Sequence, residues 1–433
     1  MVEATPGKNF MQFRISELAK GVARLSEIYT RQRQDLSAAL LRDPLLRQAY
    51  LHYFFPANLA KMKSILQEIW AHPAAREFMS PNPRILDLGC GPGTHLIGFL
   101  DFWANNHSVW ESLEGVAVDS VDANLCESRA LFVRHSELIK AAKPAARSRL
   151  QTVVADLTRL DCVQLEGEFD FIILANVLNE LFMGDECLVS RYELVSRVAA
   201  RWLARRGFLI LLEPALRETS RQLLQLRDRL LMGTDLKVYG PCVHNLPCPA
   251  VSKDHPKDWC HEDRAWITPE TVAEVDSLLG NRKDSLKFSY VILNRLGVSV
   301  KDARFSQVQQ RSTDKVPVSI QTAVIELQTP CFQTEQRNRL WSGKDLTGSE
   351  VWRVVSELME EKGKVSIFLC GEKGRRRVTR LNKHRSQTNQ AFPRLERGLV
   401  VRTDCLQIRN DQEVRVEPES RISIEFSQNE NAH

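Results

Sequence analysis

The sequence predicts an α/β protein with a doubly wound, mostly parallel sheet, preceded by a helical cap and followed by a small β-unit. Short, continuous apolar segments alternate with helical stretches, a pattern typical of parallel sheets covered on both faces. The first segment ends in a glycine-rich turn before a helix, as at the ligand-binding edge of Rossmann-like sheets. We expect strands at residues 84–88, 115–119, 150–155, 169–174, 208–213 and 288–293.

Length and composition indicate a folded protein of more than one unit. The chain has 433 residues, of which 43% are hydrophobic and 26% charged, so it can bury a core of ordinary size. The net charge of +5 permits an RNA partner but does not require one. No segment resembles a membrane span, and the N-terminus lacks a basic region followed by an apolar core. We expect a cytoplasmic protein, with the mitochondrial matrix as the alternative.

The pattern of residues predicts three regions. Helical periodicity before two prolines, Pro81 and Pro83, indicates a helical region ahead of the sheet. A segment rich in Pro, Cys, His and Asp interrupts the sheet pattern, and a polar stretch follows the last predicted strand. The predicted regions are 1–80 (helical), 81–300 (ligand-binding, with a cysteine-rich insertion at 238–268) and 301–433 (a basic β-unit, with 301–345 flexible and strands at 365–370, 378–381 and 399–402).

The strongest motif is RILDLGCGPGTHL at residues 84–96. The strand brings Asp87 to its end, and three glycines follow: Gly89, Gly91 and Gly93. Glycines are needed where a backbone turns tightly and lies against a ligand. The helix that begins next offers free N–H groups at the same edge. The motif therefore predicts a nucleotide-type ligand.

Polar residues at the ends of the next strands refine this prediction. Asp119 ends the second strand, where it can accept hydrogen bonds from ribose hydroxyls. Asp156 closes the third, where an acid can meet an adenine amine, and Asn176 follows the fourth. With these acids the motif resembles that of the S-adenosylmethionine-dependent methyltransferases of class I. The resemblance implies that Asp87 lies near the methionine end of the cofactor and that Asp119 holds its ribose.

Three closely spaced cysteines in the insertion predict a metal site. Cys242, Cys248 and Cys260 are spaced C-x5-C-x11-C among polar residues, whereas buried free cysteines usually lie in apolar elements. Thiolates at this density favour zinc or an iron–sulfur cluster, and either needs a fourth ligand. The spacing alone does not choose the metal. Local candidates for a zinc ligand are His244, His255 and His261.

The cysteine motif and the nucleotide motif together resemble a methyltransferase-like family associated with the small ribosomal subunit. The similarity rests on P-C-x5-C-P, on D-W-C-H-x-x-R, on residues 53–60 and on the segment KFSYVILNR. Its members act in mitochondrial ribosome assembly, with relatives in bacteria, and hold a [4Fe–4S] cluster. The resemblance implies that Cys242, Cys248 and Cys260 bind the cluster with Cys370 as the fourth ligand. Cys331 competes with Cys370 for this role.

The basic stretch KGRRRVTRLNKHR at residues 373–385 carries seven cationic side chains and no acid. It is interpreted either as a solvated loop or as a contact for a phosphate backbone. The resemblance implies the small ribosomal subunit and its rRNA as partners, with the free protein monomeric and no membrane contact.

No catalytic residue can be assigned from the sequence. Residues 175–180 lack both the cysteine nucleophile of cytosine methylation and the Asn/Asp-Pro-Pro-aromatic turn of amino methylation. We expect a small-subunit assembly factor that binds S-adenosylmethionine. The alternatives are an active rRNA methyltransferase and a small-molecule methyltransferase with structural zinc.

Overall fold

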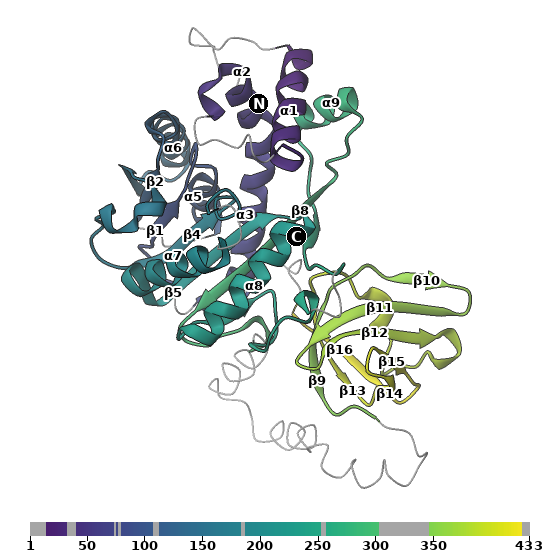
Figure 1. Cartoon of the computed structure of the whole chain (residues 1–433). Coiled ribbons are helices and arrows are strands. Elements are labelled where there is room, and N and C mark those ends of the chain that lie inside the picture. Colours follow the sequence, from purple (N-terminus) through teal and green to yellow (C-terminus); the bar gives the residue numbers. More distant parts are fainter. Residues whose placement is uncertain are drawn as a thin grey trace.

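The computed structural model describes residues 14–32, 40–72, 75–76, 79–106, 112–182, 187–252, 257–302 and 346–426. They form an α/β domain with a helical cap and a β-barrel beside it (Figure 1). The expectations for residues 303–345, for Cys331, for His255 and for the tail from Ser427 fall outside the described residues.

The main sheet has five parallel strands and an antiparallel edge. Its order is β3-β2-β1-β4-β5-β8-β6, with β7 also paired to β8. Strands β1 to β5 run parallel, and β8 is antiparallel to β5. The bounds are β1 (Arg84–Leu88), β2 (Ser112–Asp119), β3 (Arg147–Val154), β4 (Phe169–Ala175), β5 (Leu203–Pro214), β6 (Lys237–Gly240), β7 (Glu262–Ala265) and β8 (Ser285–Asn294).

All six strands expected between residues 84 and 293 are present, and the doubly wound fold class is confirmed. The cysteine-rich segment contributes β6 and β7, which pair with β8. These two strands are only four residues long, too short for a periodic pattern to identify them.

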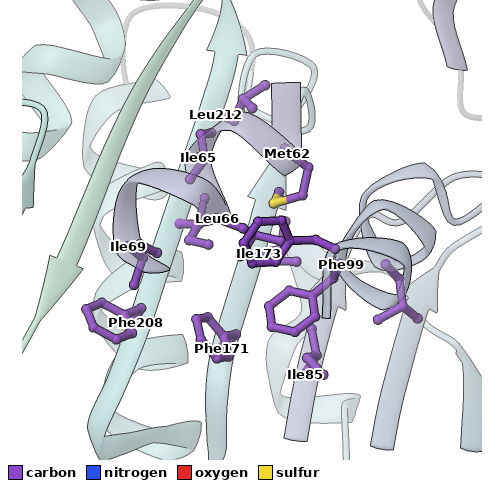
Figure 2. Close-up of a cluster of buried hydrophobic side chains, with 14 of the residues drawn as sticks. Met62, Ile65, Leu66, Ile69, Ile85, Phe99, Phe171, Ile173, Phe208 and Leu212 are labelled. Carbon is purple, nitrogen blue, oxygen red and sulfur yellow. The ribbon is translucent and has the colours of Figure 1, made fainter. Parts of the chain in front are cut away.

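Helices cover both faces of the sheet. On one face lie α3 (Phe55–Ala71), α5 (Thr94–Asn106) and α6 (Asp122–Ala142), and on the other α7 (Cys187–Trp202) and α8 (Arg217–Gly233). Figure 2 shows Met62, Ile65 and Ile69 of α3 lying against apolar side chains of the sheet. Burying one such side chain stabilises the fold by about 1.5–3 kcal/mol. Packing of this kind fixes α3 above the sheet.

The helical cap stands at the edge of the sheet (Figure 1). It consists of α1 (Ile15–Thr30), α2 (Pro44–Ala49) and α9 (Glu270–Leu279), which share an apolar core. A wider π-helical turn, η3 (Tyr50–Phe54), joins α2 to α3 just before Pro56. Proline cannot donate the helical hydrogen bond, and π-turns absorb such gaps, often at functional sites.

The C-terminal strands close into a barrel. The pairs β9–β11, β11–β12, β12–β15, β15–β14 and β13–β9 form a ring, because β13 and β14 are two halves of one strand separated at Cys405, whose φ is 57°. This five-stranded ring resembles an OB-fold. The C-terminal strands are β9 (Glu350–Val354), β10 (Met359–Glu361), β11 (Lys364–Gly371), β12 (Gly374–Leu381), β13 (Val400–Asp404), β14 (Gln407–Asn410), β15 (Glu413–Val416) and β16 (Arg421–Phe426), of which β10 and β16 lie outside the ring.

A buried ionic network joins the barrel to the α/β domain. Arg353 of β9 places its Nη2 3.2 Å from Glu262 Oε1 and 3.4 Å from Glu68 Oε2. Glu68 also accepts hydrogen bonds from Arg264 (2.9 Å) and from the Tyr290 hydroxyl (2.7 Å). Burial alone would raise the pKa of Glu262, but Arg353 and Arg264 outweigh it and lower the pKa. The network therefore favours the ionised form of Glu262 inside the interface.

None of the described helices is both long enough and apolar enough to cross a lipid bilayer.

Candidate functional site

The glycine turn after β1 has the geometry that the sequence predicts. Gly89, Gly91 and Gly93 have φ values of 71°, 52° and 81°, which side chains other than glycine rarely adopt. A Cβ on Gly89 would lie 2.4 Å from Val177, and one on Gly93 2.3 Å from Ser128. A Cβ on Gly91 would meet nothing within 4 Å. Gly91 is thus the glycine whose backbone faces open space.

Asp119, at the end of β2, holds this turn in place. Its carboxylate accepts hydrogen bonds from the backbone amides of Gly91 and Val121, both at 2.9 Å, and from the Asn124 side chain at 3.2 Å. The sequence predicted a ribose ligand for Asp119 but not this second role. A carboxylate can accept about four hydrogen bonds. Asp119 can therefore hold the turn and also accept hydrogen bonds from a ribose.

Asp87 is the most perturbed group at this edge. It is fully buried, and neither carboxylate oxygen makes a hydrogen bond of good geometry. Burial and the charge of Asp119 raise its pKa from 3.8 to about 7, an effect that the Leu96 amide partly offsets. A buried acid without a partner is costly unless it is protonated or meets a cation. The Asp87 carboxylate is therefore suited to bind a cationic group.

Asp156 and Asn176 lie at the same edge, because β1 to β4 are parallel neighbours. Asp156 is exposed and accepts hydrogen bonds from the Thr158 amide and hydroxyl, at 2.9 and 2.8 Å. Asn176 is half-buried with φ of 58°, and its amide donates to Leu212. Both side chains border the edge without converging on Asp87.

The cap adds a contact that sequence patterns did not reveal. The Tyr50 hydroxyl lies 3.1 Å from the hydroxyl of Thr94, the first residue of α5. The charges of Glu180 and Asp87 both raise the pKa of Tyr50, after the larger effect of burial. The π-turn thus brings the cap over the glycine turn.

The four predicted metal ligands line a single cavity of about 230 Å³. Cys242 follows β6, Cys248 precedes a short helix, Cys260 precedes β7, and Cys370 lies in β11 of the barrel. The fold therefore brings together three cysteines of one domain and one of the other. Five other described cysteines, Cys90, Cys126, Cys162, Cys187 and Cys405, lie outside this lining.

Burial disfavours the ionised form of the thiols that line this cavity. It raises the pKa of Cys260 to about 12 and those of Cys248 and Cys370 further. Cys242 raises all three, which places the thiols close to one another. Arginines oppose the shift: Arg397 and Arg353 lower the pKa of Cys260, and Arg375 and Arg227 lower that of Cys370.

Several other polar atoms around the cavity lack partners. Both ring nitrogens of His244, Nδ1 of His261 and the Nε atoms of Arg353 and Arg375 are buried without a hydrogen bond. Buried polar atoms are normally satisfied. Within the described residues, no three His, Cys, Asp or Glu side chains are arranged to hold a metal ion. The thiols border a cavity and do not converge on one point.

The basic stretch at residues 373–385 is mostly strand β12, and its interpretation as a solvated loop is wrong. Lys373 pairs with Glu350, Arg375 with Asp258 and Arg377 with Glu361. Arg380 is only 5% exposed. The stretch appears basic in sequence because its acidic partners lie elsewhere in the chain. Its exposed charges are Lys373, which is paired, and Lys383 and Arg385, past the end of the strand.

Asn179 and Glu213 meet away from the glycine turn. The Asn179 amide donates to Glu213 Oε1 at 3.3 Å, and both residues are buried beside α7 and α8. Burial raises the pKa of Glu213 to about 8. Asn179 and Glu213 line a small pocket together with Arg191 and Gln222.

Distant structural likenesses include methyltransferases. The plantazolicin methyltransferase BpumL is 12% identical, with a TM-score of 0.33, covering 65% of this chain and 98% of that one. The precorrin-6y C5,15-methyltransferase from Geobacter metallireducens GS-15 is 15% identical, with a TM-score of 0.26 and coverages of 49% and 79%. YjhP from E. coli is 15% identical, with a TM-score of 0.28 and coverages of 54% and 91%. No protein of curated function matches the sequence significantly.

The parallel strands β1 to β5, the antiparallel β8 and the glycine turn at the carboxyl edge define a Rossmann-like class I methyltransferase fold. The family described as mitochondrial small ribosomal subunit Rsm22 matches residues 45–394. This match covers most of the chain, which therefore belongs to that family.

The raised pKa of Asp87 predicts a pH-dependent stability. In the unfolded chain this acid ionises near pH 4, whereas in the folded chain it keeps its proton to about pH 7. The free energy of unfolding should therefore fall as pH rises between these values, by up to about 4 kcal/mol at 1.36 kcal/mol per pKa unit. Asp87→Asn, which is neutral and of similar shape, should remove this contribution and exceed the wild type in stability at pH 8.

Urea unfolding at pH 5 and pH 8 measures the difference. Asp156→Asn is the matched control, because Asp156 is exposed, and it should leave the pH dependence unaltered. An Asp87→Asn protein that parallels the wild type at both pH values would contradict the assignment.

Proposed function

We propose that this protein is a small-ribosomal-subunit factor that binds S-adenosylmethionine at the glycine turn and a [4Fe–4S] cluster in the cysteine cavity. The observation that carries the proposal is the cavity itself, where Cys370 of the barrel meets Cys242, Cys248 and Cys260 of the α/β domain. Cys370 is 110 residues from Cys260 in the sequence, yet the fold brings both cysteines to one cavity.

The side chains around the cavity fit a cluster better than a single ion. Sulfurs bound to one zinc at about 2.3 Å lie within about 3.8 Å of one another. A cluster holds its four cysteines farther apart, and its sulfides accept hydrogen bonds. The unpartnered Nε–H groups of Arg353 and Arg375 are suitable donors.

When bound, the cluster would supply iron–thiolate bonds that cross-link the two domains. Binding requires deprotonated cysteines, which burial opposes here. Nearby arginines favour deprotonation, because they lower the pKa values of Cys260 and Cys370 and so oppose the effect of burial.

Zinc is the second candidate, because His244 and His261 line the same cavity with unpartnered ring nitrogens. A local Cys/His set would satisfy tetrahedral zinc. Such a zinc site would leave Cys370 without a role. It would favour the alternative hypothesis of a small-molecule methyltransferase.

For the nucleotide site, the support is the open space at Gly91 together with the acids at the strand ends. Asp119 would bind the ribose, Asp156 the adenine amine, and the backbone of Gly89, Gly91 and Gly93 would face the cofactor. Asn176 would border its methyl end. No described side chain at this edge is assigned to methyl transfer, so an assembly role is favoured over the alternative of an active rRNA methyltransferase.

The family description names the mitochondrial small subunit, which supports the mitochondrial matrix over the cytoplasm as the location. It also supports the small subunit as the partner, and we propose that the protein binds the rRNA of that subunit and is monomeric when free. Since Lys373, Arg375 and Arg377 are paired with acids and Arg380 is buried, the contact with phosphates would come from the exposed Lys383 and Arg385.

Metal analysis tests the cysteine cavity. Anaerobically purified protein should contain iron and acid-labile sulfide in equal amounts, and Cys370→Ser should lose both because one of the four ligands is gone. Cys126→Ser is the matched control, since Cys126 is exposed and outside the cavity. Stoichiometric zinc that is indifferent to Cys370 would overturn the cluster and favour zinc.

Charge reversal tests the RNA surface. Lys383→Glu with Arg385→Glu should weaken binding to small-subunit particles and lower the log–log salt slope by about 1 per residue. Arg282→Glu is the control, because Arg282 is equally exposed on the α/β domain. Binding that the double variant leaves unchanged would rule out this surface.

A further inference from the structure

Two lysines meet in the seam between the helical cap and the carboxyl edge of the sheet. Lys61 lies in the N-terminal half of α3, and Lys283 immediately precedes β8. Strand β8 is antiparallel to β5, with Phe288 opposite Pro214. Lys283 therefore lies at the same edge as the carboxyl ends of the parallel strands, where Asp87 and the glycine turn are found.

Neither lysine forms an ion pair with a described carboxylate. The Lys61 ammonium donates to the Asn58 side-chain oxygen at 3.0 Å. The Lys283 ammonium stands over the rings of Tyr53 and Phe54, 4.2 and 4.8 Å from their centroids. The nearby Asp276 carboxylate is occupied by the Tyr53 hydroxyl (2.5 Å) and by the backbone amide of Lys283 (2.6 Å).

This arrangement is electrostatically costly without a ligand. Burial and the charge of Lys283 lower the pKa of Lys61 to about 7, and burial lowers that of Lys283 to about 8. His95, in the first turn of α5, is 3% exposed, and both its ring nitrogens lack a partner. Burial and the charge of Lys61 lower its pKa to about 3, which keeps it neutral. A bound anion would relieve these costs.

The cofactor of the proposed function carries a matching pair of charges. The amino-acid part of S-adenosylmethionine has an ammonium group and a carboxylate on one carbon atom. Asp87 is a buried acid without a cation, and the lysine pair is cationic without an acid. A chain of contacts links the two: Lys61 binds Asn58, Asn58 binds Tyr50, and Tyr50 binds Thr94 beside the glycine turn.

We propose that Lys61 and Lys283 form an oxyanion subsite that binds the carboxylate of the amino-acid part of S-adenosylmethionine, opposite Asp87. This inference rests on the proposed cofactor. An RNA phosphate offers the same chemistry, but both lysines are half-buried where the cap meets the sheet edge, which favours a small ligand. Lys61 and Lys283 thus act as binding residues on elements outside the glycine motif.

Calorimetry with two ligands tests the subsite. S-adenosylhomocysteine carries the carboxylate, whereas 5′-methylthioadenosine lacks the whole amino-acid part. Lys61→Met keeps the apolar stem and should lower the affinity for S-adenosylhomocysteine about tenfold or more, the usual effect of losing a bond to a charged group. Its affinity for 5′-methylthioadenosine should be unchanged, and Lys283→Met should act in the same direction.

A stability measurement excludes simple damage to the fold. Removing an enclosed, unpaired charge should raise the melting temperature of ligand-free Lys61→Met, whereas a structural lysine would lower it. Lys63→Met is the control on the same helix, because Lys63 pairs with Asp101 at 2.5 Å on another side of α3. It should leave both affinities unaltered.

The other outcomes each overturn the inference in a recognisable way. Equal losses for both ligands would indicate general disturbance of the pocket. Unchanged binding of S-adenosylhomocysteine with weaker binding of a small-subunit rRNA fragment would assign the lysines to a phosphate. A wild-type protein that binds neither adenosyl ligand would overturn the cofactor itself.

Discussion

Arg353 reaches from the barrel into the α/β domain and pairs there with two buried carboxylates, Glu68 and Glu262. Removing one member of such a buried set leaves a charge without a partner, at a cost of about 3–5 kcal/mol. The same residues shape the cysteine cavity. Arg353 is opposite Cys370 in the strand register, and Glu262 follows Cys260 by two residues. The contact that aligns the domains thus also aligns the sulfurs that line the cavity between them.

Helix α3 connects this interface with the cofactor edge. Glu68 lies toward its C-terminal end and Lys61 two turns earlier, about 10 Å along the axis. Between them, Met62, Ile65 and Leu66 pack on the sheet and hold the helix in place (Figure 2). One well-packed helix therefore carries both Glu68 of the interface between the domains and Lys61 of the proposed cofactor subsite.

Local patterns predicted the elements whose causes are local. The apolar strands, the three glycines at positive φ and the acids at the strand ends follow from short-range periodicity and backbone geometry. The gathering of Cys370 with the other three cysteines was predicted only through family resemblance, because 110 residues separate it from Cys260. No spacing rule covers that distance.

The misinterpreted and missed features all depend on distant partners. Arg375 pairs with Asp258, 117 residues away, so a stretch that is basic in sequence is partly neutralised in the fold. Arg353 and Glu68 are separated by 285 residues. Lys61 looked like an ordinary polar position of an amphipathic helix, and only the folded chain shows that Lys283 comes close enough to lower its pKa.

The central claim is that the cavity between the two domains is a cluster site built from both of them. Anomalous X-ray scattering from crystals of the anaerobically purified full-length protein tests it most directly. We expect a strong difference peak at the iron absorption edge inside the cavity, surrounded by the sulfurs of Cys242, Cys248, Cys260 and Cys370. A peak at the zinc edge beside His244 or His261, with the Cys370 sulfur uncoordinated, would contradict the account.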